Sequence, residues 1–361
     1  MDSPGMDGAR AFFPPGQLLR KGYTVNDLET CERVETLTEG TVVKESSSGR
    51  TRNNGAHSQG DFIFRGVTFL LAASIILILI LMGWEMVRES LPAIRKFGWR
   101  FISGREWDAV QGEFAALPYI YGSVVSSILA ILLATPLSIG TALFVTEIAP
   151  SRLGNMVAAL VELLAAIPSV IYGLWGVLVM APWLQQTVQP FLINKFGFLP
   201  FFQGAPYGVS MLAAVFILVI MIVPIITSIT KEVLLAVPGS QKEAAYALGA
   251  TRWEMMRVAL LPYARSGILG AVILGLGRAI GETMAVTMVI GNTPQISLSL
   301  LSPAYTMPSV IANEFAETTS KLHSSALMEI GLILLVITLL INVMARLLIW
   351  SVTRGRTGGH A

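Results

Sequence analysis

Residues 238–262, PGSQKEAAYALGATRWEMMRVALLP, form a polar interval between two long apolar runs, and their pattern decides the fold. Ser240 and Glu243 have the three-residue spacing of a capping box, in which two side chains satisfy otherwise unpaired backbone N–H groups. Thr251 and Glu254 repeat that spacing. The interval therefore predicts two short helices in succession, held between the apolar runs.

A sharp bend is expected between these helices, because Gly249 stands where a left-handed helix end requires glycine. We refer to this unit as the 238–262 hairpin. A unit of this kind exposes more apolar surface than an ordinary loop does, and some of that surface should meet another protein. The apolar side chains concerned are Tyr246, Leu248, Trp253, Met255 and Met256.

Six apolar runs flank the hairpin on both sides, each long enough for the roughly 20 residues that a lipid-crossing helix needs. They cover about residues 66–86, 120–146, 153–183, 207–230, 266–291 and 326–350. Charged residues make up only 13% of the chain, against roughly 25% in an ordinary soluble domain. The chain is thus expected to be an all-α membrane protein with a six-helix domain over residues 61–353.

Lysine and arginine are more frequent on the side of the membrane that holds the hairpin and both termini. The positive-inside rule then predicts that both termini and the hairpin are cytoplasmic. Residues 1–60 are polar and are interpreted as a disordered cytoplasmic tail without an assigned function. Residues 354–361 would form a second, short cytoplasmic tail.

Composition and motifs argue against several other classes of protein. Cys31 is the single cysteine, and the three histidines are scattered, so no metal site is expected. The net charge of +2 is too small to indicate a nucleic-acid partner. No GxxxxGK[ST], HExxH or GxSxG motif occurs, so we expect no bound cofactor and no catalytic residues in this chain.

The fifth run contains GRAIGETMAV at residues 277–286, with two opposite charges that lipid would reject. A continuous helix places Arg278 and Glu282, four residues apart, on one face where they can pair. Each charge costs roughly 2.5–3.5 kcal/mol at the middle of a bilayer, so both must face protein or water. Two interpretations remain open: an ion pair that serves the structure alone, or a guanidinium that lines a path and meets an anion. A planar guanidinium suits an oxyanion because it donates paired hydrogen bonds to two oxygens.

Glu162 is a further charge, within the third run. It either pairs with Arg278 across helices, which would place it on the same path, or lies near the cytoplasmic end as a hydrogen-bonding group between helices. Pro168 follows six residues later and is expected to bend this span, because proline removes a backbone N–H.

The hairpin resembles the EAA loop of ABC-importer permeases. The matching residues are Glu243, Ala244, Ala245, Gly249, Leu261 and Pro262, with Thr251 in the same loop. In that family the loop docks into a cleft on the cytoplasmic ATPase, so the resemblance implies a type I ABC-importer permease fold and a separate ATPase. Ala259 departs from the pattern, which usually has isoleucine there. Without the resemblance, the hairpin would fit a simple connection between two spans about equally well.

The stretch GRAIGETMAV resembles the fifth span of phosphate-importer permeases, in which the arginine and glutamate are implicated in transport. Residues 117–123 (LPYIYGS), 162–176 (ELLAAIPSVIYGLWG) and 297–316 are similar to the PstC type of that family rather than to its PstA-type partner. The resemblance implies import of inorganic phosphate across the cytoplasmic membrane of a bacterium. It also implies three kinds of partner: a PstA-type permease, two ATPase subunits and an extracytoplasmic phosphate-binding protein.

Two alternatives to phosphate import remain open. One is an ABC permease for another oxyanion, such as sulfate or molybdate. The other is an ion-coupled secondary carrier that would use Arg278, Glu282 and Glu162 as a charge relay. The hairpin would have no task in such a carrier.

Overall fold

The structure, a computed structural model, describes residues 57–318 and 320–354, with side chains described at 62–318 and 320–351. The chain divides into two units, residues 1–71 and residues 72–361. Of the first unit only the beginning of helix α2 (His57–Phe97) is described. The predicted tail at residues 1–60 therefore lies outside the described residues, apart from the first turn of α2. The predicted tail at 354–361 also lies outside them, apart from Arg354.

The described residues are helical throughout apart from loops, and their one bridge between extended residues joins Asp108 to Glu113. The long helices are α2, α4 (Leu117–Leu143), α9 (Met211–Leu235), α12 (Leu261–Gly281) and α15 (Lys321–Arg354). The π-helical turn η2 (Phe144–Ile148) extends α4, and α11 (Arg252–Met255) with the turn η6 (Met256–Leu260) precedes α12. Within residues 57–318 and 320–354, five helices are long and apolar enough to cross a membrane, or six if one bent pair counts as a span.

The bent pair is the predicted third run, which the structure divides into two helices at an angle of 93°. Helix α5 (Ser151–Ala166) ends before Ile167, and α6 (Ser169–Trp175) begins after Pro168. Ile167 has extended backbone, which a following proline favours, and Pro168 lacks the N–H that would continue the helical hydrogen bonds. The predicted bend at Pro168 is confirmed. Beyond α6 the chain continues through η3 (Gly176–Met180), α7 (Ala181–Trp183), η4 (Leu184–Val188) and α8 (Gln189–Phe196).

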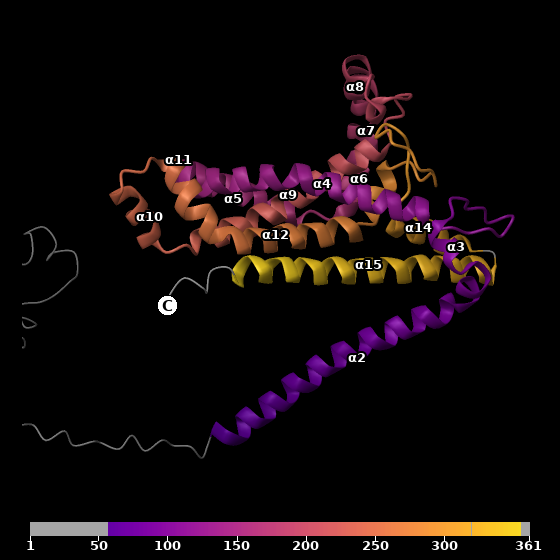
Figure 1. The fold of residues 1–361 in the computed structure, drawn as a ribbon, viewed down its shortest axis with the longest axis horizontal. Helices are drawn as coiled ribbons and strands as arrows, with labels where there is room; N and C mark the ends of the chain where they lie inside the picture. The colour runs from indigo at the N-terminus through magenta and orange to yellow at the C-terminus, as the bar shows by residue number, and fades with distance from the viewer. Residues whose placement is uncertain (1–56, 319, 355–361) are drawn as a thin grey trace, which may run out of the picture. The chain divides into compact units, whose positions relative to one another are not determined.

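Helix α9 is the centre of the second unit. It packs against α4, α5 and α12, and these helices lie side by side in Figure 1. Its buried side chains are mostly aliphatic, including Ile217, Ile222 and Ile226, and they form one core with residues from α4, α6 and α12. Pro224 lies inside α9 without dividing it. A helix that is apolar on every side is expected at the centre of a membrane bundle.

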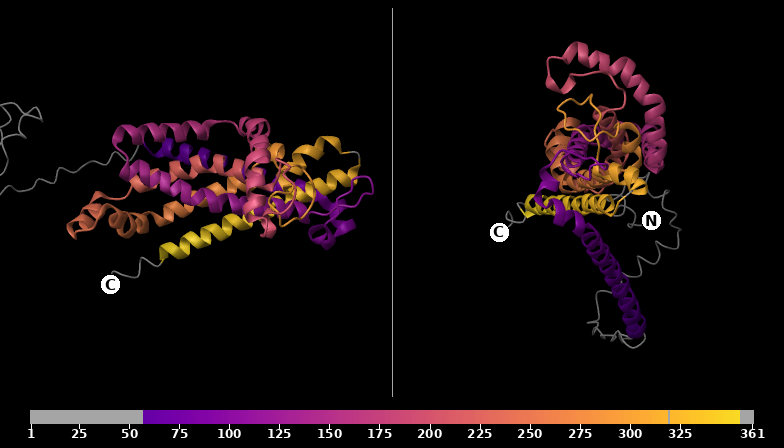
Figure 2. Two further views of the ribbon diagram at one scale, coloured as in Figure 1. Left: turned by 90° about the horizontal axis from the view of Figure 1, so that it is seen from above. Right: turned by 90° about the vertical axis from the view of Figure 1, so that its right-hand side faces the viewer.

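The two ends of the bundle differ in structure. The 238–262 hairpin lies at one end, and the loop of residues 291–306 lies at the other (Figure 2). This loop leads from α13 (Met284–Val289) to α14 (Met307–Glu314). We call these the hairpin end and the loop end of the bundle.

A second core of aromatic residues closes the loop end. Trp107, Phe114 and Tyr119 meet edge to face, with ring centroids 4.8 and 5.0 Å apart. The Trp107 indole donates to Glu314 at 2.9 Å, and the same carboxylate oxygen lies 3.1 Å from the His323 ring nitrogen Nε2. These contacts fix α3 (Trp99–Ser103) and its following loop onto α14 and α15. Burial, with Glu314 nearby, raises the pKa of Tyr305 to about 12, so this phenol stays neutral at physiological pH.

Helix α4 approaches the loop of residues 291–306 closely at Gly122. A Cβ atom at this position would overlap the carbonyl oxygen of Tyr305. The neighbouring Ser123 hydroxyl accepts a hydrogen bond from the Met307 N–H at 2.8 Å. Glycine is required here because the two backbones touch.

Gly122→Val should therefore destabilise the protein by about 1–3 kcal/mol, the usual cost of overpacking a core. The matched control is Gly140→Val on the same helix, where no atom lies within 4 Å of an added Cβ. Thermal unfolding of both purified variants in detergent measures the difference. Equal unfolding temperatures would show that the close approach at Gly122 is unimportant.

Candidate functional site

The fifth span is broken in the middle of its charged motif. Helix α12 ends at Gly281, Glu282 has extended backbone with φ −71° and ψ 124°, and α13 starts at Met284. The predicted continuous helix over residues 266–291 is therefore wrong. The helix that carries this run is longer than the run itself, because it already begins in the 238–262 hairpin, at Arg252.

The charges of Arg278 and Glu282 explain the position of this break. Arg278 lies in the last turn of α12, where the partial negative charge of a helix end favours a cation. The Glu282 carboxylate accepts a hydrogen bond from the Ala285 N–H at 3.3 Å, so it caps the start of α13. Each charge thus stabilises the end of one half of the span.

The two charged side chains lie close together but differ in exposure. Nη2 of Arg278 is 3.7 Å from Oε2 of Glu282. The Arg278 side chain is 45% exposed in the isolated chain, whereas that of Glu282 is only 5% exposed. Arg278 therefore reaches the surface of the bundle, anchored by a buried carboxylate. A cation at such a position must face a second protein or a water-filled path, since lipid would reject it.

The break of the fifth span adjoins the bend of the third span. Helix α13, which follows the break, packs against α6, which follows Pro168. Tyr172 of α6 and Ala285 and Val286 of α13 belong to one buried core. Discontinuous helices that meet in this way supply polar backbone and charged groups at membrane depth in many transporters.

Glu162 is not part of this arrangement. Its carboxylate lies 3.1 Å from the Lys231 amine of α9, and its side chain is 59% exposed. The possible pairing of Glu162 with Arg278 is therefore wrong, and the contact joins α5 to α9 instead. The sequence analysis did not foresee Lys231 as the partner, because 69 residues separate the two positions.

The 238–262 hairpin has the predicted bend but not both predicted caps. Helix α10 (Gly239–Ala247) is followed by Gly249 with φ +81°, and the Thr251–Glu254 capping box is formed. Ser240 forms no cap, because Pro238 occupies the N-cap position and Ser240 lies inside the helix. The second helix is also not short, since it continues into α12 through Leu261 and Pro262.

The hairpin exposes some of the expected apolar side chains and buries others. Leu248 is 90% exposed, Trp253 62% and Tyr246 44%. Met255 and Met256 are buried, which corrects their predicted exposure, and they pack in a core with residues of α4, α9 and α12. Of the other residues matched to the EAA loop, Glu243, Ala244, Gly249 and Thr251 are exposed, while Ala245, Leu261 and Pro262 are half-buried.

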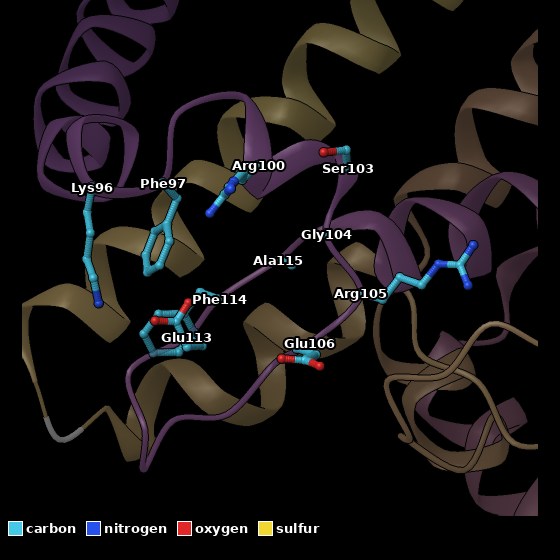
Figure 3. Close-up of a pocket in the computed structure, with 10 residues that line it drawn as sticks. All are labelled: Lys96, Phe97, Arg100, Ser103, Gly104, Arg105, Glu106, Glu113, Phe114 and Ala115. Atoms are coloured by element: carbon cyan, nitrogen blue, oxygen red, sulfur yellow. The ribbon is translucent and has the colours of Figure 1, made fainter.

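An open cavity of about 530 Å³ lies at the loop end, between the end of α2, α3 and the loop after α3. Figure 3 shows Lys96, Phe97 and Arg100 on one side of it and Glu113 and Phe114 on another. The sequence analysis missed this cavity, because its lining comes from irregular backbone. The described residues contain no group of three His, Cys, Asp or Glu side chains that could hold a metal ion.

Fold and site together define the class of the protein, a helical membrane permease. Residues 134–354 match the family model of the binding-protein-dependent transport system inner membrane component. The phosphate transport system permease protein PstC of Mesorhizobium japonicum is 48% identical over 305 residues, which cover 82% of this chain and 92% of that protein. The PstC of Haemophilus influenzae is 43% identical, with 81% and 93% covered. The chain therefore belongs to the family of binding-protein-dependent inner-membrane permeases, and within it to the PstC permeases.

The solved structures show the same fold. A chain of a bacterial alginate ABC transporter, in complex with an alginate pentasaccharide-bound periplasmic protein, has a TM-score of 0.54 at 16% identity. The match covers 79% of this chain and 94% of that chain. The fold is thus shared with a chain of an ABC transporter. In the permease family to which this chain belongs, a separate subunit hydrolyses ATP.

Proposed function

We propose that this chain is the permease subunit that carries inorganic phosphate across the cytoplasmic membrane in an ATP-driven importer. The single observation that supports this most strongly is Arg278 at the break of the fifth span, paired with a buried carboxylate yet 45% exposed. A planar guanidinium in that position can donate two hydrogen bonds to a passing phosphate. The names of the PstC relatives support phosphate as the ion.

The exposure of Arg278 also indicates where the path runs. In the isolated chain its surface is uncovered, so the path would lie between this chain and a second, PstA-type permease. Glu282 would hold the guanidinium in place and compete with the anion for it. This competition limits the affinity for phosphate. A guanidinium that already has a carboxylate partner binds the passing anion less tightly and can release it.

The remaining partners follow from the hairpin. Its exposed Leu248, Trp253 and Tyr246 would dock one of two ATPase subunits, and Glu243, Ala244 and Gly249 would shape the docking helix. An extracytoplasmic phosphate-binding protein would deliver the ion at the loop end. In this arrangement both termini are cytoplasmic, and the chain itself binds no cofactor.

Uptake of labelled phosphate by the reconstituted four-component complex tests the proposal. We expect ATP-dependent uptake that unlabelled phosphate suppresses and that sulfate or molybdate at the same concentration leaves unchanged. Suppression by sulfate or molybdate would reassign the substrate to another oxyanion. Uptake that continues without ATP and stops when the ion gradient is removed would instead establish an ion-coupled carrier.

A further inference from the structure

Helix α10 of the 238–262 hairpin is linked to the spans by one polar side-chain contact. The Lys242 amine lies 2.5 Å from a Glu147 carboxylate oxygen of η2, at the end of α4. None of the residues of α10 is buried. Among the described residues, no other side chain of α10 forms a hydrogen bond or ion pair with another helix.

The carboxylate of this ion pair is better shielded from water than the one in the Lys231–Glu162 pair. The Glu147 side chain is 13% exposed and that of Lys242 25%, whereas Glu162 in the Lys231 pair is 59% exposed. Exposed pairs contribute little, but breaking a shielded pair leaves a charge without its partner in a poorly solvated place. The contact therefore resists separation when α10 moves.

Glu147 lies at one end of a helix that reaches the other end of the bundle. Residues Leu117–Ile148 form 32 residues of continuous helix, about 48 Å at 1.5 Å per residue. At the loop end, the Tyr121 hydroxyl donates to the Ser297 carbonyl at 2.6 Å, and Ser123 accepts from Met307. Tyr121 and Val125 also share an apolar cavity of about 330 Å³ with Leu298. Helix α4 thus connects α10 to the loop of residues 291–306 by side-chain contacts at both ends.

We propose that the Lys242–Glu147 ion pair transmits movement of α10 to α4, and through α4 to the loop of residues 291–306. Lys242 and Glu147 are positioning residues in this scheme, because neither lies at the break that carries Arg278. The inference rests on the proposed function in one respect, that an ATPase moves α10. It extends that function by naming the contact through which the hairpin end controls the loop end.

A cysteine at position 298 makes the movement measurable without phosphate. Leu298 is 64% exposed, and Cys31, the single natural cysteine, is replaced by serine. The chain is co-purified with its ATPase and second permease and placed in lipid nanodiscs. The rate at which a water-soluble maleimide labels Leu298→Cys is then compared with and without ATP and vanadate. We expect ATP to change this rate by about fivefold or more, the lower range of typical allosteric coupling.

Glu147→Gln and Lys242→Gln should each abolish the ATP-dependent change while the complex still forms and hydrolyses ATP. The double variant Glu147→Lys with Lys242→Glu restores the opposite charges and should regain most of the change. Glu85→Gln is the control, since Glu85 forms a well-exposed pair with Arg88 on α2, 3.8 Å apart. In this control, ATP should change the labelling rate as much as it does in the Leu298→Cys protein without further substitutions.

Any of three labelling results would overturn the inference: no effect of ATP on labelling of the Leu298→Cys protein, an unchanged effect in either single variant, or a double variant that stays uncoupled. Loss of ATPase binding in the Lys242 variant would also overturn it, because Lys242 would then act in docking. Since no phosphate is present, a wrong substrate assignment leaves this measurement unaffected. Phosphate uptake by the starting complex reports separately on the proposed function.

Discussion

Arg278→Gln should lower phosphate uptake by the assembled complex roughly 10- to 100-fold. A hydrogen bond to a charged group contributes about 1.5–3 kcal/mol, and about 1.4 kcal/mol corresponds to a factor of ten. Glutamine keeps a hydrogen-bond donor, but its side chain is shorter than that of arginine and it loses the charge and the paired donors. It also leaves the Glu282 carboxylate, which is 5% exposed, without its cation. Arg278→Lys should have an intermediate rate, since it keeps the charge and loses the planar fork.

The control for Arg278→Gln is Arg346→Gln, the same chemical change in the exposed part of α15. Both variants should insert in the membrane and bind the ATPase as the starting protein does. Uptake should then fall in the Arg278 variant alone. Normal uptake by Arg278→Gln in a correctly assembled complex would remove Arg278 from the path.

Trp253→Asp and Leu248→Asp should each abolish co-purification of the ATPase with the permease. These side chains are 62% and 90% exposed in the isolated chain, on the outer surface of the 238–262 hairpin. Large side chains at the centre of a protein interface often contribute 2 kcal/mol or more, and a buried carboxylate without a partner adds a penalty. We expect the apparent affinity to fall about 30-fold or more, because about 2 kcal/mol corresponds to that factor.

Val110→Asp is the matched control for the docking variants. Val110 is 96% exposed and belongs to the loop after α3, at the loop end of the bundle. It should leave ATPase binding unchanged, which shows that an added charge on an exposed apolar residue is tolerated. If the two hairpin variants bind the ATPase as tightly as Val110→Asp does, the hairpin is not the docking surface.

Local chemistry in the sequence predicted a large part of this fold. The six apolar runs, the bend at Pro168, the left-handed Gly249 and the capping box of Thr251 and Glu254 all depend on residues close together in the chain. Short-range rules are sufficient for such features. Ser240 shows the limit of the capping-box rule. The N-cap of α10 is Pro238, two residues earlier, so Ser240 lies inside the helix.

The features that the sequence did not predict depend on distant residues or on a competition between local rules. Lys242 and Glu147 are 95 residues apart, and nothing near either one indicates the other. The burial of Met255 and Met256 is decided by helices that pack over them. The break at Glu282 was not predicted, because the apolar run continues through it in the sequence. Arg278 before Gly281 and Glu282 after it are nevertheless residue types that helix ends favour.

The shortness of α13 has a consequence for how the molecule changes state. An isolated helix of six residues is not stable in water, because nucleation costs more than so few hydrogen bonds return. The conformation of α13 therefore depends on its surroundings, chiefly the Glu282 cap and the side chains of α6. We expect rearrangement of this segment to need far less work than bending any of the long helices. The long helices can then move as rigid bodies during each turnover without bending, while only the six residues of α13 are remade.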